Sequence, residues 1–308
     1  MKKYLLTFLT FSFCYMQGNI GGYAIFDYSN ASGNDGFDIK RAYFSYSSDI
    51  SEELLFKIRL DVGRDQDGGK LNSYLKNAYV DWKCENGDKL SMGLIGTNSY
   101  GVQEKNWGYR FVEKSVLDKY IMTNTADFGI GYSKKFGQFK TSLQLLNGEG
   151  FKSEESNNQQ ALYFSLLYGE SKLNQNDGFN FGVVINHVPQ EDGIDNSLVG
   201  FFGGWASNNL RFGLEHNQYK EKAFSYTKDV SSLYTNYTIS DNWDIFFRHD
   251  IHNEELDVNM LPENSGELPS EFAIYGGVWN PTKGLYISPN VHVADGTHTY
   301  HLTCMFQY

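Results

Sequence analysis

Charged side chains alternate with apolar ones along several short segments of the sequence. In residues 56–61, Lys57, Arg59 and Asp61 alternate with phenylalanine, isoleucine and leucine. A β-strand directs successive side chains to opposite faces, so this spacing places the charges on one face and the apolar groups on the other. Basic groups gathered on such a face attract anions, and carboxylates attract cations. The sequence therefore predicts a charged sheet face whose chemistry is the attraction of ions.

The same alternation assigns further charged residues to this face. Its bases are Arg41, Lys57, Arg59, Lys140, Arg211 and Arg248. Its acids are Asp61, Asp81, Asp127, Glu215, Asp244 and Asp250. Because the signs are mixed, we expect partial pairing across strands, and a solvated or paired side chain is the simpler interpretation of any single residue. As a set, four of these bases and two bases of a long loop predict a weak path for anions, namely Arg41, Lys57, Arg59 and Arg248 with Arg110 and Lys114.

Motifs of catalytic and metal sites do not occur in the sequence. It contains no Gly-x-Ser-x-Gly, no His-Glu-x-x-His and no phosphate-binding glycine loop with its lysine. Residues 61–69 faintly resemble a calcium loop but lack the bidentate glutamate, so an acidic surface loop is the better interpretation. We expect no enzyme, no metal and no cofactor, although a barrel hydrolase with its Ser and His on different strands stays open.

The composition excludes several classes of protein. The chain of 308 residues contains 22 Tyr and 23 Phe, which is enough apolar surface to exclude intrinsic disorder. Its three cysteines are too few for a disulfide scaffold. Its net charge of −11 gives no general attraction to nucleic acid, so no nucleic-acid partner is expected.

The first residues have the pattern of an export signal. Lys2 and Lys3 precede an apolar run over residues 4–15, and Gly18 is a small residue near a plausible cleavage point. The run is shorter than the roughly 20 residues of a membrane-spanning helix, which makes a membrane anchor the weaker alternative. We expect a signal peptide over residues 1–18 and a single domain over residues 19–308.

About sixteen segments with a hydrophobic period of two follow the signal. They cover residues 20–28, 37–48, 53–62, 73–83, 89–97, 126–134, 138–147, 159–170, 178–187, 197–206, 209–219, 229–239, 242–251, 271–279, 284–292 and 297–308. Most are near the roughly 9–11 residues that a tilted strand needs to cross a bilayer. Short connections alternate with long polar ones, a pattern typical of outer-membrane barrels with short periplasmic turns and long extracellular loops.

Alternation alone does not distinguish a membrane barrel from a soluble sheet protein. The export signal, the aromatic residues near strand ends and the aromatic terminus at Tyr308 favour a barrel whose apolar face meets lipid. An open sheet edge in hydrocarbon would leave backbone groups unpaired, so the predicted fold is an all-β, closed, transmembrane antiparallel barrel. This strand count leaves room for a water-filled channel. The alternative fold is a secreted β-sandwich or propeller.

The longest connection, residues 98–125, is the third long loop and is rich in aromatic side chains. Phe111, Lys114, Leu117 and Tyr120 recur at roughly helical spacing, so we expect part of the loop to be a short helix. Long loops of this kind are usually functional. We expect the loop to fold into the barrel and narrow it; the alternative is an exposed cap.

The candidate channel-lining and constriction residues combine bases of the wall with bases of this loop. They are Arg41, Lys57, Arg59, Lys105, Arg110, Lys114, Lys140, Arg211 and Arg248. Three loop acids, Glu104, Glu113 and Asp118, nearly balance the loop bases.

The order and spacing of several fragments resemble the phosphate-selective porin family, of the porin O and P type, from the outer membrane of Gram-negative bacteria. The fragments are residues 37–43, 75–81, 90–96, 107–110, 127–131, 145–150 and 246–250. The resemblance implies a sixteen-stranded trimeric channel with the third loop folded inward. It also implies, for some members, selection of anions by basic residues at the constriction.

The predicted function is an outer-membrane porin that forms a water-filled channel for passive diffusion of small hydrophilic solutes or ions, with anions such as phosphate among them. The expected partners are outer-membrane lipid and lipopolysaccharide, the latter bound through divalent cations at the acidic loops. The expected location is the outer membrane of a Gram-negative-type bacterium, and the expected assembly is a homotrimer. The alternative function is a secreted or surface β-protein that acts as an adhesin or binding module.

Overall fold

A computed structural model describes residues 18–30, 35–64, 70–190, 195–222, 226–255 and 268–308. Apart from Gly18, the expected signal peptide lies outside the described residues.

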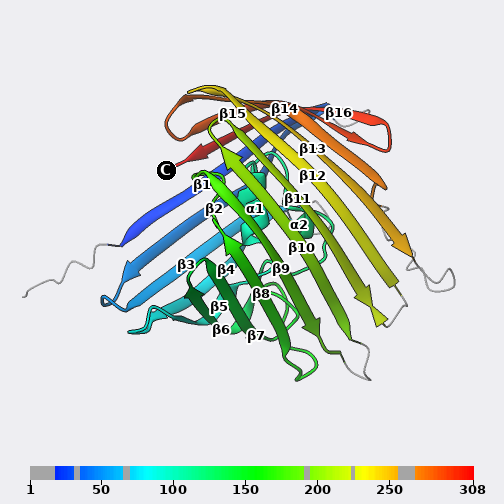
Figure 1. Ribbon diagram of the computed structural model, residues 1–308. Coiled ribbons are helices and arrows are strands. Elements are labelled where there is room, and N and C mark those ends of the chain that lie inside the picture. Colours follow the sequence, from blue (N-terminus) through cyan, green and yellow to red (C-terminus); the bar gives the residue numbers. More distant parts are fainter. Residues whose placement is uncertain (1–17, 31–34, 65–69, 191–194, 223–225, 256–267) are drawn as a thin grey trace, which may run out of the picture.

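Sixteen antiparallel strands follow one another along the chain (Figure 1). They are β1 (Asn19–Asn30), β2 (Gly36–Asp49), β3 (Leu54–Arg64), β4 (Leu71–Lys83), β5 (Lys89–Gly96), β6 (Ala126–Phe136), β7 (Phe139–Leu146), β8 (Ala161–Gly169), β9 (Gly178–Val188), β10 (Asn196–Ser207), β11 (Leu210–Glu221), β12 (Tyr226–Ser240), β13 (Trp243–Glu255), β14 (Glu271–Thr282), β15 (Leu285–Ala294) and β16 (Thr297–Gln307). Each expected segment overlaps one of these strands, with ends that differ by a few residues.

The strands close into a single barrel in which every strand pairs with its neighbours along the chain. The closure joins β1 to β16 in an antiparallel register that runs from Tyr23 opposite Gln307 to Asn30 opposite Tyr300. The closed ring confirms the predicted all-β antiparallel barrel. A sandwich or a propeller, the alternative folds, would divide the strands among separate sheets, and that alternative is wrong.

The two faces of the barrel wall differ in polarity as the alternation predicted. On β7, Leu143 and Leu145 point outward and are 46% and 44% exposed, whereas Gln144 between them points inward and is buried. Exposed Phe, Leu, Ile, Trp and Tyr side chains occur on almost all strands. An apolar outer surface of this extent is favourable only where hydrocarbon covers it, which is the environment of a membrane barrel.

Connections of two kinds alternate around the ring, except that two at the long-loop end, β11 to β12 and β15 to β16, are as short as the turns. The short ones join β2 to β3, β4 to β5, β6 to β7, β10 to β11, β12 to β13 and β14 to β15. The start of β1 and the end of β16 lie on the same side of the barrel (Figure 1). The connection between β8 and β9, residues 170–177, belongs to the short-turn end but is longer than its counterparts.

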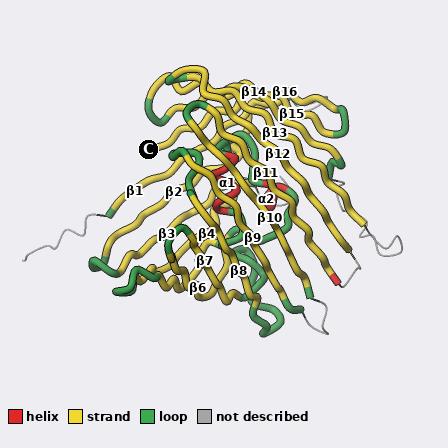
Figure 2. Tube along the Cα trace, in the orientation of Figure 1, coloured by secondary structure: helices red, strands yellow, loops and turns green. Residues whose placement is uncertain are grey.

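The connection between β5 and β6, here called the inward loop (residues 97–125), lies inside the barrel, where Figure 2 shows its helices α1 (Gly101–Trp107) and α2 (Val116–Lys119) in red. The predicted inward fold is confirmed, as is a short helix near Leu117. The helix α1 was not expected, because its sequence GVQEKNW has no apolar period. No helix among the described residues is long and apolar enough to cross a membrane.

Candidate functional site

Aromatic packing seats the first half of the inward loop on one side of the barrel. Trp107 is 1% exposed, and its ring centre lies 5.8 Å from that of Tyr234 and 5.7 Å from that of Phe246. Phe111 approaches Tyr286 on β15 with ring centres 6.0 Å apart. Edge-to-face ring pairs each add about 0.5–1.5 kcal/mol beyond the burial of area. The loop is therefore held against β12, β13 and β15.

A second apolar cluster seats the other half of the loop. Its loop members Val116, Leu117 and Tyr120 are at most 1% exposed and pack with wall residues that include Leu198 and Val230. Full burial of such a side chain contributes about 1.5–3 kcal/mol. The two clusters together hold the loop along strands β8 to β15 and leave its opposite side facing the rest of the barrel.

Buried polar groups of the wall pair with backbone carbonyls of the loop. Arg248 is fully buried, binds both carboxylate oxygens of Asp250 at 2.8 and 2.7 Å, and donates to the carbonyl of Lys114 at 2.5 Å. Lys228 donates to the carbonyl of Tyr120 at 2.9 Å. Because unpaired buried polar groups are costly, these bonds define one position of the loop.

Carboxamides complete the attachment. Asn106 of α1 and Asn180 of β9 exchange two hydrogen bonds of 2.8 and 2.9 Å. The carbonyl of Trp107 accepts from Arg211 at 3.2 Å and from Asn236 at 3.0 Å. The loop is thus bonded to the wall at both ends of its helical part.

The free side of the loop carries a small network of charges. The Arg110 guanidinium lies 3.2 Å from a Glu104 oxygen and 3.1 Å from an Asp118 oxygen. Lys114 approaches Asp118 at 3.9 Å. All four side chains keep partial exposure, so they contact water in the barrel.

The two glutamates of the loop, Glu104 and Glu113, differ in pKa because their surroundings differ. Burial raises the pKa of Glu104, and nearby Arg110 opposes that rise. Burial alone would also raise the pKa of Glu113, but Lys119 and His292 hold it well below its usual range. Burial would lower the pKa of Arg110, yet its two carboxylate partners raise it, so the guanidinium stays charged. Glu104 therefore takes up a proton at a higher pH than Glu113 does.

The inner wall of β2 to β4 is rich in bases. Its bases are Arg41, Lys57, Arg59 and Lys76, and its acids are Asp61 and Asp81. Asp61 is fully buried and accepts from Arg41 at 2.9 and 3.0 Å and from Lys76 at 3.5 Å. Asp81 is engaged by Lys89 of the next strand at 2.9 Å. The bases outnumber the acids, which leaves this wall positively charged.

This basic wall faces the charged side of the inward loop. In the ring order β3 is far from the strands that carry the loop. Lys40 of β2 nonetheless donates to the carbonyl of Val112 in the loop at 3.4 Å. One cavity is lined both by Arg41 of β2 and by Arg110 and Lys114 of the loop, so the loop and the wall face each other across it. The narrow part of the interior is therefore bounded by Glu104, Arg110 and Asp118 on one side and by the basic wall on the other.

Six of the nine predicted residues are on the basic wall or on the inward loop, and three of them, Arg41, Arg110 and Lys114, line one cavity. Three are on the wall, namely Arg41, Lys57 and Arg59, and three are on the loop, namely Lys105, Arg110 and Lys114. The other three lie apart. Lys140 donates to Ser171 near the short-turn end at 2.6 Å, Arg211 lies beneath the loop, and Arg248 is buried behind it.

Sequence reasoning missed Lys76. Asp81 points inward, so strict alternation assigns Lys76 to the lipid face, but a shift of register between Arg59 and Leu60 turns both Lys76 and Asn77 inward. The sequence did contain one indication that Lys76 points inward, because a lone lysine among lipid-facing residues costs about 2–4 kcal/mol at the bilayer midplane.

A cavity of about 430 Å³ adjoins the narrow region on the long-loop side. Its lining includes five bases, Lys40, Arg41, Arg64, Arg110 and Lys114, against the two acids Asp38 and Glu113. One acid is already engaged, since Asp38 binds Arg64 at 2.6 Å. Bases outnumber acids on this lining, which makes it electropositive and able to attract anions. Each of the five bases also lies within 3.9 Å of a carboxylate, namely that of Asp27, Asp38, Asp61, Glu104 or Asp118.

Comparison with known proteins supports the fold. No family model matches the sequence, and no curated protein is similar to it. Among solved structures, OmpF of Salmonella typhi in complex with daunomycin matches with a TM-score of 0.72 at 10% identity, over 94% of this chain and 97% of that chain. An anion-selective porin from Comamonas acidovorans matches with a TM-score of 0.62 at 10% identity, over 95% and 99%.

The trimer form of OmpT, an outer membrane protein of Vibrio cholerae, matches with a TM-score of 0.62 at 11% identity, over 95% of this chain and 99% of that chain. These matches span nearly the whole length of each protein. At such identities they establish the architecture, and this chain has the sixteen-stranded barrel fold of the Gram-negative outer-membrane porins.

Proposed function

We propose that this protein is a porin of the outer membrane of a Gram-negative-type bacterium, through which small hydrophilic solutes and ions diffuse passively. The observation that carries the proposal is a closed barrel with an apolar exterior, whose polar interior is narrowed by a charged loop. The long loops then lie on the extracellular side and the short turns on the periplasmic side. No catalysis and no cofactor are part of this function. An adhesin or binding module is not favoured, because such a role does not call for a narrowed interior.

We further propose a weak preference for anions, with phosphate among the solutes. The basic wall of β2 to β4 and the electropositive cavity beside it support this sign. The similar barrel from Comamonas acidovorans is an anion-selective porin, which is consistent with this preference. Of the predicted residues, Arg41, Lys57, Arg59, Arg110 and Lys114 carry the preference, and Lys76 joins them.

The test is the zero-current potential of the purified protein in planar bilayers across a gradient of potassium chloride. We expect the sign that corresponds to chloride permeation. Replacing both Arg59 and Lys76 with glutamine should reduce that potential strongly, because two fixed positive charges leave the narrow region. Lys220→Gln is the matched control, since Lys220 is on the outward side of β11 and is exposed. A preference for potassium in the native protein contradicts the anion proposal, and the lack of any conductance contradicts the channel.

The proposed assembly is a homotrimer in contact with lipid and lipopolysaccharide. The matching OmpT structure is described as a trimer form. Outward Gly22, Ala24 and Ala42 give the paired strands β1 and β2 a flat outer surface, which suits close packing of subunits. Light scattering of the detergent-solubilised protein measures the mass directly, and a mass of one chain contradicts the trimer.

A further inference from the structure

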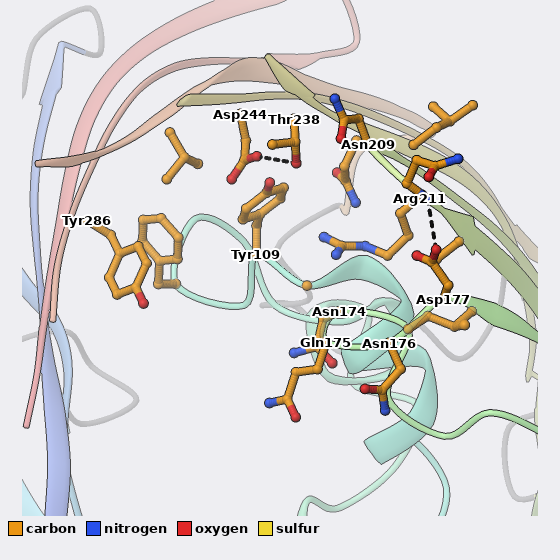
Figure 3. Close-up of a pocket in the computed structure, with 18 of the residues that line it drawn as sticks. Tyr109, Asn174, Gln175, Asn176, Asp177, Asn209, Arg211, Thr238, Asp244 and Tyr286 are labelled. Carbon is orange, nitrogen blue, oxygen red and sulfur yellow. Dashed lines mark hydrogen bonds between the residues drawn. The ribbon is translucent and has the colours of Figure 1, made fainter. Parts of the chain in front are cut away.

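A second cavity, of about 600 Å³, lies on the short-turn side of the inward loop (Figure 3). Its volume is within the range of roughly 300–1,000 Å³ that is usual for small-molecule sites. Tyr109 of the loop and Arg211 of β11 project into it, and Tyr286 of β15 forms another wall. The inward loop separates this second cavity from the electropositive cavity, so a solute that crosses the barrel meets the two cavities one after the other.

The long turn of residues 170–177 builds one side of this second cavity. Leu173 is 3% exposed and is packed so close to Gly204 that a Cβ there would lie 2.8 Å from the leucine. Asn180 donates to the carbonyl of Glu170 at 2.6 Å, and the carbonyl of Lys172 accepts from the backbone of Gln175 at 2.9 Å. The turn is therefore packed and hydrogen-bonded against the inside of the barrel, which explains why it is longer than the other turns at this end.

Side-chain carboxamides dominate the lining. Those of Asn174, Gln175 and Asn209 have no hydrogen-bond partner among the described residues, and all three residues are exposed and line the cavity. A carboxamide offers donors and acceptors together. Hydroxyl groups also donate and accept hydrogen bonds, so a solute that is rich in hydroxyl groups can pair with these carboxamides.

The charged groups of the cavity are already engaged. Arg211 donates to the carbonyl of Trp107 and lies 5.5 Å over the ring of Tyr109. Asp244 accepts from Thr238 at 2.7 Å, and Asp177 accepts from the backbone of Asn208 at 3.0 Å. One base against two acids gives this lining no excess of positive charge to hold an anion, whereas the lining of the first cavity has five bases against two acids.

Aromatic rings add an apolar surface of defined shape. Tyr286 is half-buried, and its ring together with Tyr109 borders the cavity. Ring faces pack against the C–H face of a pyranose, while carboxamides around them bond the hydroxyl groups. Two buried polar atoms of residues that line the cavity, Nε of Arg211 and Oδ1 of Asn236, also lack partners among the described residues.

We propose that this cavity binds a neutral, polyhydroxylated solute of the size of a mono- or disaccharide on the periplasmic side of the constriction. The proposal deepens the porin function and rests on it, because the solute reaches the site through the channel or from the periplasm. It makes the protein a channel with a sugar-binding site beyond its narrowest point.

Maltose added to single channels in planar bilayers tests the site. Maltose should lower the potassium chloride current in a saturable manner, more strongly from the short-turn side. Polyethylene glycol of the same hydrodynamic size should lower it without saturation, because it has no ring of hydroxyl groups. If maltose and the glycol act alike, the current falls through volume exclusion only and the proposal is overturned.

The paired substitution Asn174→Ala/Gln175→Ala should raise the half-blocking maltose concentration at least about fivefold, since each lost hydrogen bond contributes about 0.5–1.5 kcal/mol. The matched control is Gln138→Ala/Asn242→Ala, two exposed residues in other turns of the same end that do not line the cavity. Equal effects of the two pairs overturn the site.

Failure of the porin function itself gives a different result, namely no conductance in any variant. In that case, calorimetry of maltose binding to the detergent-solubilised protein decides the site alone. Binding by the native protein that is weakened in the Asn174/Gln175 pair supports the site, and no binding overturns it.

Discussion

Single residues determine where the inward loop lies. Arg248 was predicted from alternation to line the channel, and it does point inward, but the loop covers it completely. Its two bonds to Asp250 and its bond to the carbonyl of Lys114 make it an attachment point for the loop. A buried arginine of this kind influences permeation through the position of the loop rather than by direct contact with ions.

We expect Arg248→Met to loosen the inward loop, because it leaves the buried carboxylate of Asp250 without its ionic partner and with the hydroxyl of Ser232 as a neutral donor. Removing one member of a buried ion pair costs about 3–5 kcal/mol. Single-channel recordings should show larger current noise, and the thermal unfolding midpoint should fall. The double variant Arg248→Met/Asp250→Asn should recover part of that stability. Unchanged current noise in the single variant would show that the loop does not depend on this pair.

Ile121 ends α2 in a backbone conformation that is unfavourable for its residue type. Its φ is +52°, and the backbone N–H of Met122 donates to the carbonyl of Leu117 at 2.9 Å, the long bond of a Schellman motif. Glycine is usual at this position because a Cβ costs about 1–2 kcal/mol in the left-handed region. The side chain of Ile121 is 75% exposed, so packing contributes little in return.

Ile121→Gly should therefore stabilise the loop by about 0.5–1 kcal/mol, after the greater entropy of glycine in the unfolded chain is subtracted. Hydrogen exchange of the amides of residues 116–122 should slow. Ile121→Ala keeps the Cβ and should gain less. Faster exchange in the glycine variant would mean that the exposed side chain does stabilise the turn.

At the scale of the loop as an element, acid and base are arranged so that pH changes its charge. Glu104 has a raised pKa through burial, whereas Glu113 has a lowered one through Lys119. As pH falls from neutrality, Glu104 becomes neutral first, while Arg110 stays charged. Loss of one negative charge makes the constriction more positive.

We therefore expect the preference for anions to increase as the pH falls, beginning above the pH at which an ordinary glutamate takes up its proton. Zero-current potentials measured from pH 8 to pH 4 follow the change. Glu104→Gln should show the stronger anion preference already at neutral pH and a flatter pH dependence. If the native protein and this variant respond identically to pH, another group is responsible.

The strands allow a test with two matched substitutions, because of two adjacent residues in one strand, one faces lipid and the other faces the water-filled interior. Leu143 is outward on β7, between Tyr132 and Phe164 of the adjacent strands, and Ser142 is inward, where its hydroxyl contacts that of Ser133. Leu143→Arg should cost about 2–4 kcal/mol of folding free energy in lipid vesicles, and Ser142→Arg much less. Equal costs in equilibrium unfolding would mean that the outward face is not in hydrocarbon.

The strands could be predicted from the sequence because their signal is local. Each carries its own period of two, and all sixteen were found from that period alone. The position of Lys76 depends on a bulge opposite Arg59, and bulges leave no local trace in the alternation.

The contacts that attach the loop to the wall could not be predicted from the sequence either. The seat of Trp107 against Tyr234 and Phe246 joins residues more than a hundred positions apart, so no window of sequence contains both partners. The inward direction of the loop was predictable from its aromatic content, and its contacts were not.

At the scale of the whole molecule, charge is unevenly distributed. The chain carries a net charge of −11, yet its narrow interior is bordered by more bases than acids. Several acids of the long loops, such as Asp65, Asp67, Glu191, Asp192 and Glu263, lie outside the described residues. Net charge is therefore a poor guide to ion preference, because permeating ions respond to the nearest fixed charges within a Debye length of about 8–10 Å.

The pairing of β1 with β16 has a consequence for biogenesis. The strands β1 and β16 are hydrogen-bonded neighbours, so the wall has two unpaired strand edges until β16, Thr297–Gln307, pairs with β1. A wall that lacks β16 cannot complete its insertion, since unsatisfied edge amides are not tolerated in hydrocarbon. Entry into the bilayer as a finished ring therefore requires that β16 is paired with β1.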